Sequence, residues 1–384
     1  MKFEFATTTR IIFGRGVVQE VAPIAIGMGQ CVCVVTGRAL ERTATLLETL
    51  RKQGLKTVAF SVPGEPTTST VLEGVEYARR AGSDLVIGIG GGSVIDTGKA
   101  IAALLTNSGD LFDYLEVIGH GKQLRQASAP YIAIPTTAGT GAEVTRNAVI
   151  GSPKHRVKVS MRSPLMLPRL AVVDPLLTLS MPPSLTAFTG LDALTQLMEA
   201  FVSNKANPLT DGICREGMKR VGRSLRKVFQ YGSDQIARED MSLASLFGGL
   251  ALANAGLGAV HGFAGPMGGM FPAPHGAICG RLLPHVMAAN VHALKHREPN
   301  AVALARYDEV AQILTGQKTA RAAEGVSWVK DLCAQLQVPP LRVFSLKESL
   351  FPDVVTKVRE ASSTKGNPIV LTDEELLLIL GQAI

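Results

Sequence analysis

The stretch from Asp84 to Lys99 constrains the fold of this chain more than any other segment. It begins with the apolar run 85–89, which predicts a buried parallel strand, and it continues with apolar residues at helical spacing. Between the strand and the helix stand Gly90, Gly91, Gly92 and Ser93. A turn without large side chains lets backbone N–H groups and the positive end of the helix dipole approach a diphosphate. The stretch therefore predicts an anion-binding strand–turn–helix unit.

The alternative is a glycine-rich turn that only connects two elements. Three consecutive glycines cost too much backbone entropy for packing alone to be the better explanation. Asp96 is expected in the first helical turn, where a carboxylate suits the helix dipole. The spacing differs from G-x-G-x-x-G, so the common dinucleotide fingerprint does not apply.

Apolar runs elsewhere in the first half alternate with helical patterns, which predicts a parallel sheet with crossover helices. Further strands are expected at 31–35, 57–62, 131–135 and 170–174, with two short strands between Phe3 and Phe13. From Ser184 onward the periodicity is helical, with almost no candidate strands. A chain of 384 residues fits two domains. We therefore predict an α/β dinucleotide-binding domain over 1–180 and an all-α metal and substrate domain over 181–384.

Bulk composition excludes several classes of protein. The net charge is +7, but Lys and Arg are scattered without interleaved aromatic residues, so no nucleic-acid partner is expected. The chain shows no signal-peptide pattern and no apolar run of membrane-spanning length, so we expect a cytoplasmic protein without a membrane partner. No pair of the five cysteines forms C-x-x-C, and Cys31 and Cys33, which share one face of a predicted strand, are interpreted as small core residues in a reducing compartment. The five cysteines are Cys31, Cys33, Cys214, Cys279 and Cys333.

A second cluster of polar residues directly follows the predicted strand 131–135. Its hydroxyls belong to Thr136, Thr137 and Thr140. Ligands of open α/β sheets bind at the carboxyl ends of the strands, which favours a ligand-binding role. A helix N-cap rich in Ser and Thr explains the same residues equally well, and both interpretations stay open.

A third cluster has the composition of a metal site. His261 and His275 are joined by a segment rich in Gly and Pro, and Asp192 lies on an apolar helix upstream. Two imidazoles and a carboxylate suit a divalent metal. Gln196 lies one turn after Asp192, where its amide oxygen is either a weak additional ligand or a space-filling group. A lone histidine is more often a core residue, but the pair with a helix-borne Asp favours a metal.

Taken in order, these motifs resemble the iron-containing (group III) alcohol dehydrogenase family, which has a dehydroquinate synthase-like architecture. The matching stretches are Phe-Gly-Arg-Gly at 13–16, Gly-Gly-Gly-Ser-Val-Ile-Asp at 90–96, Pro-Thr-Thr-Ala-Gly-Thr-Gly-Ala-Glu-Val at 135–144, Asp-Pro at 174–175, Leu-Asp-Ala-Leu-Thr at 191–195, the segment 261–276, Leu-Leu-Pro-His-Val at 282–286 and Asn-Pro at 367–368. The resemblance spans nearly the whole chain. It implies reversible hydride transfer between a nicotinamide cofactor and a small alcohol, aldehyde or ketone.

The resemblance also implies a catalytic metal held by Asp192, position 196, His261 and His275. Two departures from the family pattern matter. Position 196 is Gln rather than His, and position 265 is Gly where members often place a His near the nicotinamide. The related glycerol dehydrogenases bind zinc with one Asp and two His, so three ligands remain workable. We therefore expect a weakly bound divalent metal, iron or zinc.

For the cofactor, the resemblance implies a diphosphate on Gly91–Ser93 with Thr136, Thr137 and Thr140 nearby, and with Lys158 as a weaker neighbour. Members often place an Asp at position 37, where it selects NAD by repelling a 2′-phosphate. Gly37 has no charge and Arg38 could pair with a phosphate, so NADP is favoured over NAD. A homodimer is the family expectation.

Two rival functions remain open from the sequence. One is a metal-independent reductase of the maleylacetate-reductase kind, which shares the fold. The other is a cofactor-binding protein whose catalytic site has decayed, with Gln196 and Gly265 as signs of that decay.

Overall fold

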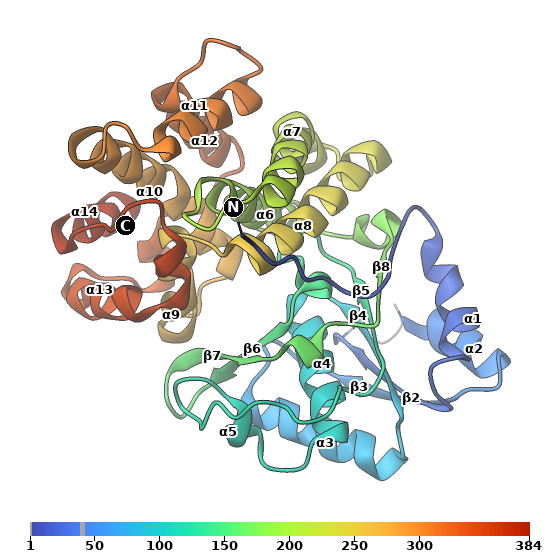
Figure 1. Cartoon of the computed structure of the whole chain (residues 1–384). Helices are drawn as coiled ribbons and strands as arrows, with labels where there is room; N and C mark the ends of the chain where they lie inside the picture. The colour runs from blue at the N-terminus through green and yellow to red at the C-terminus, as the bar shows by residue number, and fades with distance from the viewer. Residues whose placement is uncertain (1, 39–42) are drawn as a thin grey trace. The chain divides into compact units, whose positions relative to one another are not determined.

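In the computed structural model, which describes residues 2–38 and 43–384, the glycine turn joins the middle of a parallel sheet to a helix (Figure 1). The sheet has six strands in the order β1-β8-β5-β4-β2-β3, and each neighbouring pair is parallel. The strands are β1 (Ile11–Phe13), β2 (Cys31–Thr36), β3 (Lys56–Ser61), β4 (Leu85–Gly90), β5 (Tyr131–Pro135) and β8 (Leu170–Val173). The predicted α/β architecture is confirmed.

Helices cover both faces of this sheet because successive side chains of a strand point to opposite faces. On β2, Val32 and Val34 pack against α1 (Val21–Ala25) and α2 (Ala44–Lys52). Cys33 and Val35 face the other layer. That layer contains α3 (Thr68–Ala81), α4 (Gly92–Thr106) and the short α5 (Leu111–Tyr114). The four inner strands β2, β4, β5 and β8 are buried on both faces, which explains their continuous apolar runs.

The order of the strands places a topological switch between β2 and β4. The chain passes from β2 to β3 at one edge of the sheet and then returns to form β4 on the other side of β2. Open α/β sheets bind ligands beyond the carboxyl ends of the strands at such a switch. Gly37 and the glycine turn follow these two strands directly, so both lie at this position.

The sequence patterns missed an antiparallel hairpin, β6 (Asn147–Ser152) and β7 (Val157–Arg162), in the same α/β unit. The side chain of Lys99 on α4 anchors residues 142–147, the segment that leads into this hairpin. The buried Nζ of Lys99 donates to the carbonyl of Ala142 at 3.0 Å, to Thr145 Oγ1 at 2.9 Å and to the carbonyl of Asn147, and it lies 3.0 Å from Asp96 Oδ1. A buried ammonium needs this many acceptors to offset its lost hydration.

The prediction of two short strands between Phe3 and Phe13 is wrong for its first half. Only β1 forms, and the residues up to Ala6 belong with the helical unit. The backbone of Ala6 is held by Asn254, whose Oδ1 accepts from the Ala6 N–H and whose Nδ2 donates to its carbonyl. A side-chain amide has therefore replaced a neighbouring strand as the hydrogen-bond partner.

The helical unit consists of Leu179–Ile384 together with the residues up to Ala6 and Ala138–Thr140, and the α/β unit consists of Thr7–Thr137 and Gly141–Thr178. The division into 1–180 and 181–384 predicted above assigns both of these short segments to the α/β domain instead. The helices are α6 (Pro183–Val202), α7 (Pro208–Gln230), α8 (Gln235–Ala255), α9 (Ala259–Met270), α10 (His275–Arg297), α11 (Val302–Thr315), α12 (Ala322–Gln335), α13 (Phe351–Glu360) and α14 (Asp373–Ala383). They share one apolar core.

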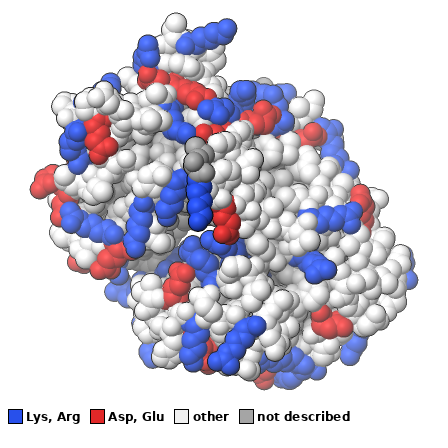
Figure 2. Space-filling model, in the orientation of Figure 1, with Lys and Arg blue, Asp and Glu red and all other residues white. Residues whose placement is uncertain are grey.

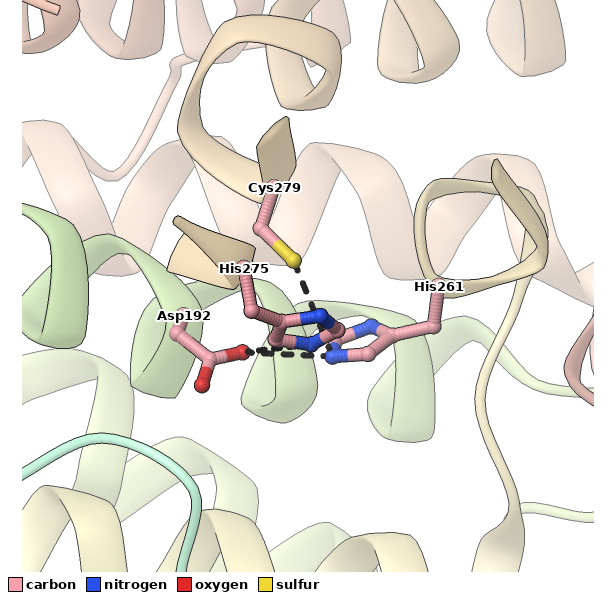
Figure 3. Close-up of side chains that lie close together, drawn as sticks. All are labelled: Asp192, His261, His275 and Cys279. Atoms are coloured by element: carbon pink, nitrogen blue, oxygen red, sulfur yellow. Dashed lines mark hydrogen bonds and ion pairs between the residues drawn. The ribbon is translucent and has the colours of Figure 1, made fainter. Parts of the chain in front are cut away.

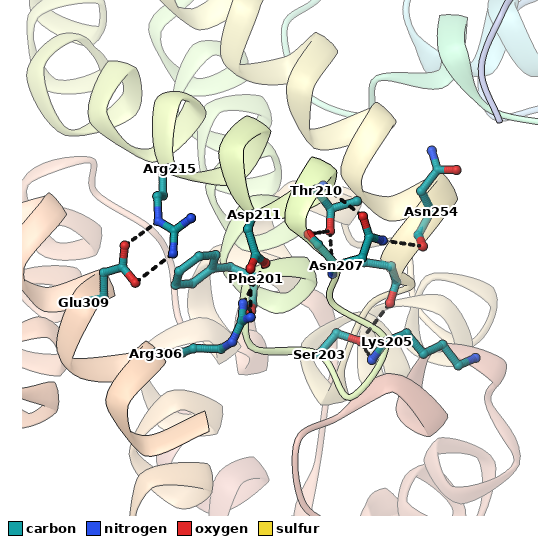
Figure 4. A network of polar contacts seen from close by, with 11 residues as sticks. Phe201, Ser203, Lys205, Asn207, Thr210, Asp211, Arg215, Asn254, Arg306 and Glu309 are labelled. Atoms are coloured by element: carbon teal, nitrogen blue, oxygen red, sulfur yellow. Dashed lines mark hydrogen bonds and ion pairs between the residues drawn. The ribbon is translucent and has the colours of Figure 1, made fainter. Parts of the chain in front are cut away.

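Helix α6 carries Asp192 and Gln196 of the candidate metal residues, and its C-terminal end is held by charged groups (Figure 4). Nη1 of Arg306 on α11 donates to the Phe201 carbonyl at 2.7 Å and to Asp211 Oδ1 at 2.6 Å. Its Nη2 donates to Asp211 Oδ2 at 2.8 Å. The same guanidinium lies 5.0 Å from the centroid of the Phe201 ring, within cation–π range. Arg306 therefore joins α6, α7 and α11.

We expect Arg306→Ala to lower the free energy of unfolding by about 2–3 kcal/mol, because it leaves a largely buried carboxylate and carbonyl without their donor. Urea unfolding followed by the fluorescence of Trp328, the one tryptophan and a residue of α12, measures this unit. The control is Arg321→Ala, which removes an exposed pair with Asp308 and should cost under about 1 kcal/mol. Equal losses in the two variants would contradict the anchoring role of Arg306.

Among the described residues, no single helix combines the length and apolar character needed to cross a bilayer. Only α8 and α9 taken together meet that test, and they are bent by 101°. Figure 2 shows that the basic side chains on the visible face form several groups, many of them near acidic residues. On this face the positive charge does not form one uninterrupted stripe.

Candidate metal centre and dinucleotide turn

Three helices of the helical unit bring four potential metal donors together (Figure 3). Asp192 lies on α6, His261 lies near the start of α9, and His275 is the first residue of α10. Cys279 follows His275 by four residues, which places both on one face of α10. One donor atom from each side chain lies within 4.8 Å of all the others.

Asp192 lies next to both imidazoles of this donor cluster, which consists of Asp192, His261, His275 and Cys279. Its Oδ1 lies 3.2 Å from His261 Nε2 and 3.8 Å from His275 Nε2. Cys279 Sγ lies 3.9 Å from His261 Nε2. The side chains of Asp192 and His261 are only 3% and 7% exposed, whereas that of His275 is 32% exposed. The cluster is therefore accessible on the side of His275.

Glu199, which the sequence analysis did not identify, fixes the ring of His261. Glu199 Oε2 lies 2.7 Å from His261 Nδ1, and Oε1 accepts from the Val260 N–H at 2.6 Å. A carboxylate on the far nitrogen of a histidine sets the tautomer that leaves the other nitrogen free to ligate. Glu199 lies seven residues after Asp192 on α6, so helical spacing alone could have identified it.

Gln196 presents its amide nitrogen, not its oxygen, to the donor cluster. Nε2 lies 3.4 Å from Asp192 Oδ1 and donates to the carbonyl of Thr140 at 3.3 Å. The amide oxygen Oε1 is buried without a hydrogen-bond partner. Turning the amide over would place that oxygen against two other oxygens. In this arrangement Gln196 therefore supports Asp192 and supplies no donor atom to a metal.

The charges in the cluster reinforce one another. Burial alone would lower the pKa of the imidazoles, but Cys279 and Asp192 raise the pKa of His261 well above its usual range, and Cys279 raises that of His275. Burial alone would raise the pKa of Asp192 and Cys279, but the two imidazoles lower both. The arrangement stabilises anionic oxygen and sulfur next to positive charge. A divalent cation bound there would take the place of the imidazole protons.

Cys279 is a buried core residue that also belongs to the donor cluster, which the sequence did not predict. All five thiols are buried and free, but Cys279 belongs to the donor cluster. Its spacing of four residues from His275 was visible in the sequence.

In the α/β unit, the glycine turn leaves the start of α4 open to an anion. Gly91 is the N-cap residue, and no side chain caps the first helical N–H groups. A Cβ at Gly90 would lie 2.6 Å from Val94, so a larger residue would push the turn away from the helix. Asp96 is not in the first helical turn as predicted. Its carboxylate pairs with Lys99 and accepts from the Val149 N–H, so it holds β6 and does not face the turn.

The other predicted cofactor residues occupy different positions. Thr136 and Thr137 follow β5, and the Thr136 N–H donates to the Gly90 carbonyl, which places them beside the glycine turn. Gly37 and Arg38 follow β2, where the Arg38 Nε donates to the Pro63 carbonyl. Thr140 belongs to the helical unit. Lys158 on β7 forms an ion pair with Glu65 at 3.1 Å, so its ammonium group already has a carboxylate partner.

Comparisons with known proteins agree along the whole chain. Residues 8–175 match the family model described as iron-containing alcohol dehydrogenase, and residues 186–384 match the C-terminal model of the Fe-containing alcohol dehydrogenase family. A 1,3-propanediol dehydrogenase of Klebsiella pneumoniae is 35% identical over 340 residues, which cover 88% of this chain and 86% of that protein. Alcohol dehydrogenase 4 of Saccharomyces cerevisiae strain YJM789 is 32% identical over 377 residues, with 97% and 96% coverage. A crystal structure of a 1,3-propanediol oxidoreductase matches 100% of both chains with a TM-score of 0.92 at 31% identity.

Proposed function

The chain belongs to the iron-containing alcohol dehydrogenase family of NAD(P)-dependent oxidoreductases, and from this premise we propose that Asp192, His261 and His275 hold its catalytic divalent metal. The observation that supports the proposal most directly is the convergence of these three side chains from α6, α9 and α10. Carboxylate oxygen and imidazole nitrogen are ordinary ligands of divalent iron and zinc. The donor set therefore fits the metal that the family uses.

When bound, the metal stabilises negative charge on the alcohol or aldehyde oxygen, and the nicotinamide donates or accepts the hydride. The side chains of the protein prepare this chemistry. Glu199 holds His261 in the tautomer that leaves Nε2 free, and the Gln196 amide supports Asp192. Gly265, on α9, has no proton-transfer group, and a Cβ built there meets no atom within 4 Å. We propose that water or the hydroxyl of the substrate transfers the proton that a histidine at position 265 would otherwise transfer.

For the cofactor, we propose that the diphosphate binds the N–H groups of Gly91, Gly92 and Ser93, with Thr136 and Thr137 beside it. The uncapped start of α4 and its position at the switch between β2 and β4 support this assignment. Thr140 and Lys158 are weaker candidates, because the first belongs to the helical unit and the second already has Glu65 as a partner. Asp96 contributes indirectly, through Lys99.

We also propose that NADP(H) is preferred over NAD(H). Gly37 directly follows β2 beside the switch, and a Cβ built on it meets no atom within 4 Å. No carboxylate at position 37 repels a 2′-phosphate. Arg38 uses one of its five N–H donors on the Pro63 carbonyl, which leaves most of its guanidinium for a phosphate.

We expect Gly37→Asp to shift the ratio of kcat/KM values toward NAD(H) by about tenfold, because a carboxylate binds both ribose hydroxyls and repels the 2′-phosphate. The open space at Gly37 means that folding should be unaffected. Steady-state kinetics with both cofactors measure the shift. Gly212→Asp adds the same charge at an exposed, uncrowded position on α7 and should leave the ratio unchanged. A wild-type protein that used NADH far better than NADPH would contradict the proposed preference for NADP(H).

Removal of the metal tests the proposed function as a whole. The protein should reduce small aldehydes or ketones and oxidise the corresponding alcohols, lose activity in a strong chelator and regain it when a divalent metal is returned. The assay is a panel of such substrates with NAD(H) and NADP(H). Activity that survives complete metal removal would favour the metal-independent reductase. Cofactor binding without activity on any substrate or metal would favour a decayed site.

We further expect a homodimer that acts in the cytoplasm. Light scattering of the purified protein measures its mass directly, and a monomeric mass would contradict the dimer. Fractionation of the producing cells locates it.

A further inference from the structure

We propose that Cys279 is the fourth protein ligand of the metal, in place of the side chain at position 196, and that its thiolate shifts the preference of the site from iron toward zinc. This inference rests on the proposed function, because it assigns a ligand to the same metal. It goes beyond the three-ligand site by naming a sulfur donor and by favouring zinc over iron.

Position 196 has no suitable donor atom directed at the cluster. Its Nε2 faces two oxygens, Asp192 Oδ1 and the Thr140 carbonyl, which fixes the amide in that orientation. Its Oε1 is the buried atom without a partner, and it lies near the backbone of Gly248, where a Cβ would be only 2.8 Å from it. An amide nitrogen is not a ligand for a divalent metal. With Asp192, His261 and His275 alone, the site would therefore have three protein donors.

Cys279 is placed to supply the fourth. It lies one helical turn after His275 on α10, and its Sγ points into the space between the two imidazoles (Figure 3). In a tetrahedral zinc site, ligand bonds of about 2.0–2.3 Å put neighbouring donor atoms roughly 3.4–3.6 Å apart. The separations in the donor cluster are 3.2 Å from Asp192 Oδ1 to His261 Nε2, 3.8 Å from the same oxygen to His275 Nε2, and 3.9 Å from His261 Nε2 to Sγ. Small side-chain rotations suffice to reach the expected values.

The chemistry of the donors points to zinc. A thiolate is a soft ligand that favours zinc over the harder divalent metals, whereas a set of one carboxylate and three imidazoles lacks that bias. Zinc also accepts a fifth donor during catalysis. His275 is the member of the cluster with a part-exposed side chain, so an additional oxygen ligand has access on that side. A fourth protein ligand is therefore compatible with substrate binding.

Cobalt(II) is the direct probe, because a cobalt–thiolate bond produces an intense charge-transfer band in the near ultraviolet that nitrogen and oxygen ligands do not. We expect the full-length protein, stripped of metal and titrated with Co²⁺, to bind one equivalent and to show this band. Cys279→Ser and Cys279→Ala should both lose the band. Both should also bind Zn²⁺ at least about tenfold more weakly in competition with a chelating indicator, whereas Fe²⁺ affinity should change less. Cys279→Ser and Cys279→Ala are both included because a folding defect in one of them would leave the other to test the proposal.

The matched control is Cys333→Ser. Cys333 is a buried, free thiol of α12 in the same helical unit, and its Sγ donates to the Gly280 carbonyl outside the donor cluster. This variant should keep the band and the zinc affinity. In the double variant Cys279→Ser with Gln196→His, a restored imidazole should recover tight metal binding, now favouring iron, but without the band.

The outcomes separate this proposal from the proposed function. One equivalent of cobalt bound without the charge-transfer band, with unchanged zinc affinity in Cys279→Ser, would overturn the thiolate ligand and leave the metal-dependent function intact. No binding of cobalt, zinc or iron would overturn both.

Discussion

His275→Ala is expected to lower the turnover number for aldehyde reduction by about a thousandfold or more, because a metal ion contributes several kcal/mol of transition-state stabilisation. The substitution removes one of the three donors assigned to the metal. The dissociation constant for NADPH should stay within about twofold, since the glycine turn belongs to the other structural unit. Steady-state kinetics and cofactor titration by fluorescence measure the two quantities separately.

His285→Ala provides the matched control on the same helix. His285 lies on α10, is part-buried and hydrogen-bonds to Gln382 Oε1 at 3.0 Å, outside the donor cluster. Its removal should leave turnover essentially unchanged. If His275→Ala turned over like the wild type, the metal would not carry the chemistry, and the metal-independent reductase would become the better explanation.

Glu199→Gln is expected to weaken metal binding by about 10- to 100-fold, the usual range for a residue that orients a histidine ligand. Both carboxylate oxygens of Glu199 accept hydrogen bonds, one from the His261 side and one from the Val260 N–H. A glutamine has only one acceptor oxygen, so one of these partners must lose its bond. Competition of the metal with a chelating indicator measures the change in affinity.

The corresponding control is Glu309→Gln, which removes a carboxylate paired with Arg215 elsewhere in the helical unit. It should reduce stability slightly and leave metal affinity alone. Because Glu199 acts through His261, its effect should appear in the metal dissociation constant before it appears in turnover at saturating metal. An unchanged dissociation constant would show that His261 keeps its orientation without Glu199.

The sequence predicted the parts of the fold that depend on apolar periodicity. The strands that became β2, β4 and β5 were recognisable as buried apolar runs, and the family resemblance drawn from the ordered motifs is confirmed. The hairpin β6–β7 was missed because polar residues and a glycine interrupt its apolar positions, although the buried side chains alternate regularly along both strands. The segment before β1 was misassigned because its partner is the side chain of Asn254, and no local pattern indicates such a distant contact.

For the candidate site, the sequence identified Asp192, His261 and His275 but missed two residues that complete the arrangement. Glu199 and Cys279 lie on the same helices at spacings of seven and four from identified residues, so a search along helical faces would have found both. The direction of the Gln196 amide could not be predicted. It depends on the carbonyl of Thr140, which lies 56 residues away in the chain.

The buried Lys99 has a consequence for how the enzyme meets its cofactor. Its ammonium group is held by Asp96, Thr145 and two carbonyl groups, so α4 cannot shift without exposing an unpaired charge to an apolar interior. The glycine turn at the start of α4, which we propose as the diphosphate site, is thereby preorganised before any dinucleotide arrives. Binding then immobilises the ligand but little of the protein, which reduces the entropic cost of association. Amide hydrogens along α4 should accordingly exchange slowly with solvent even in the cofactor-free enzyme, and the arriving cofactor should protect them little further.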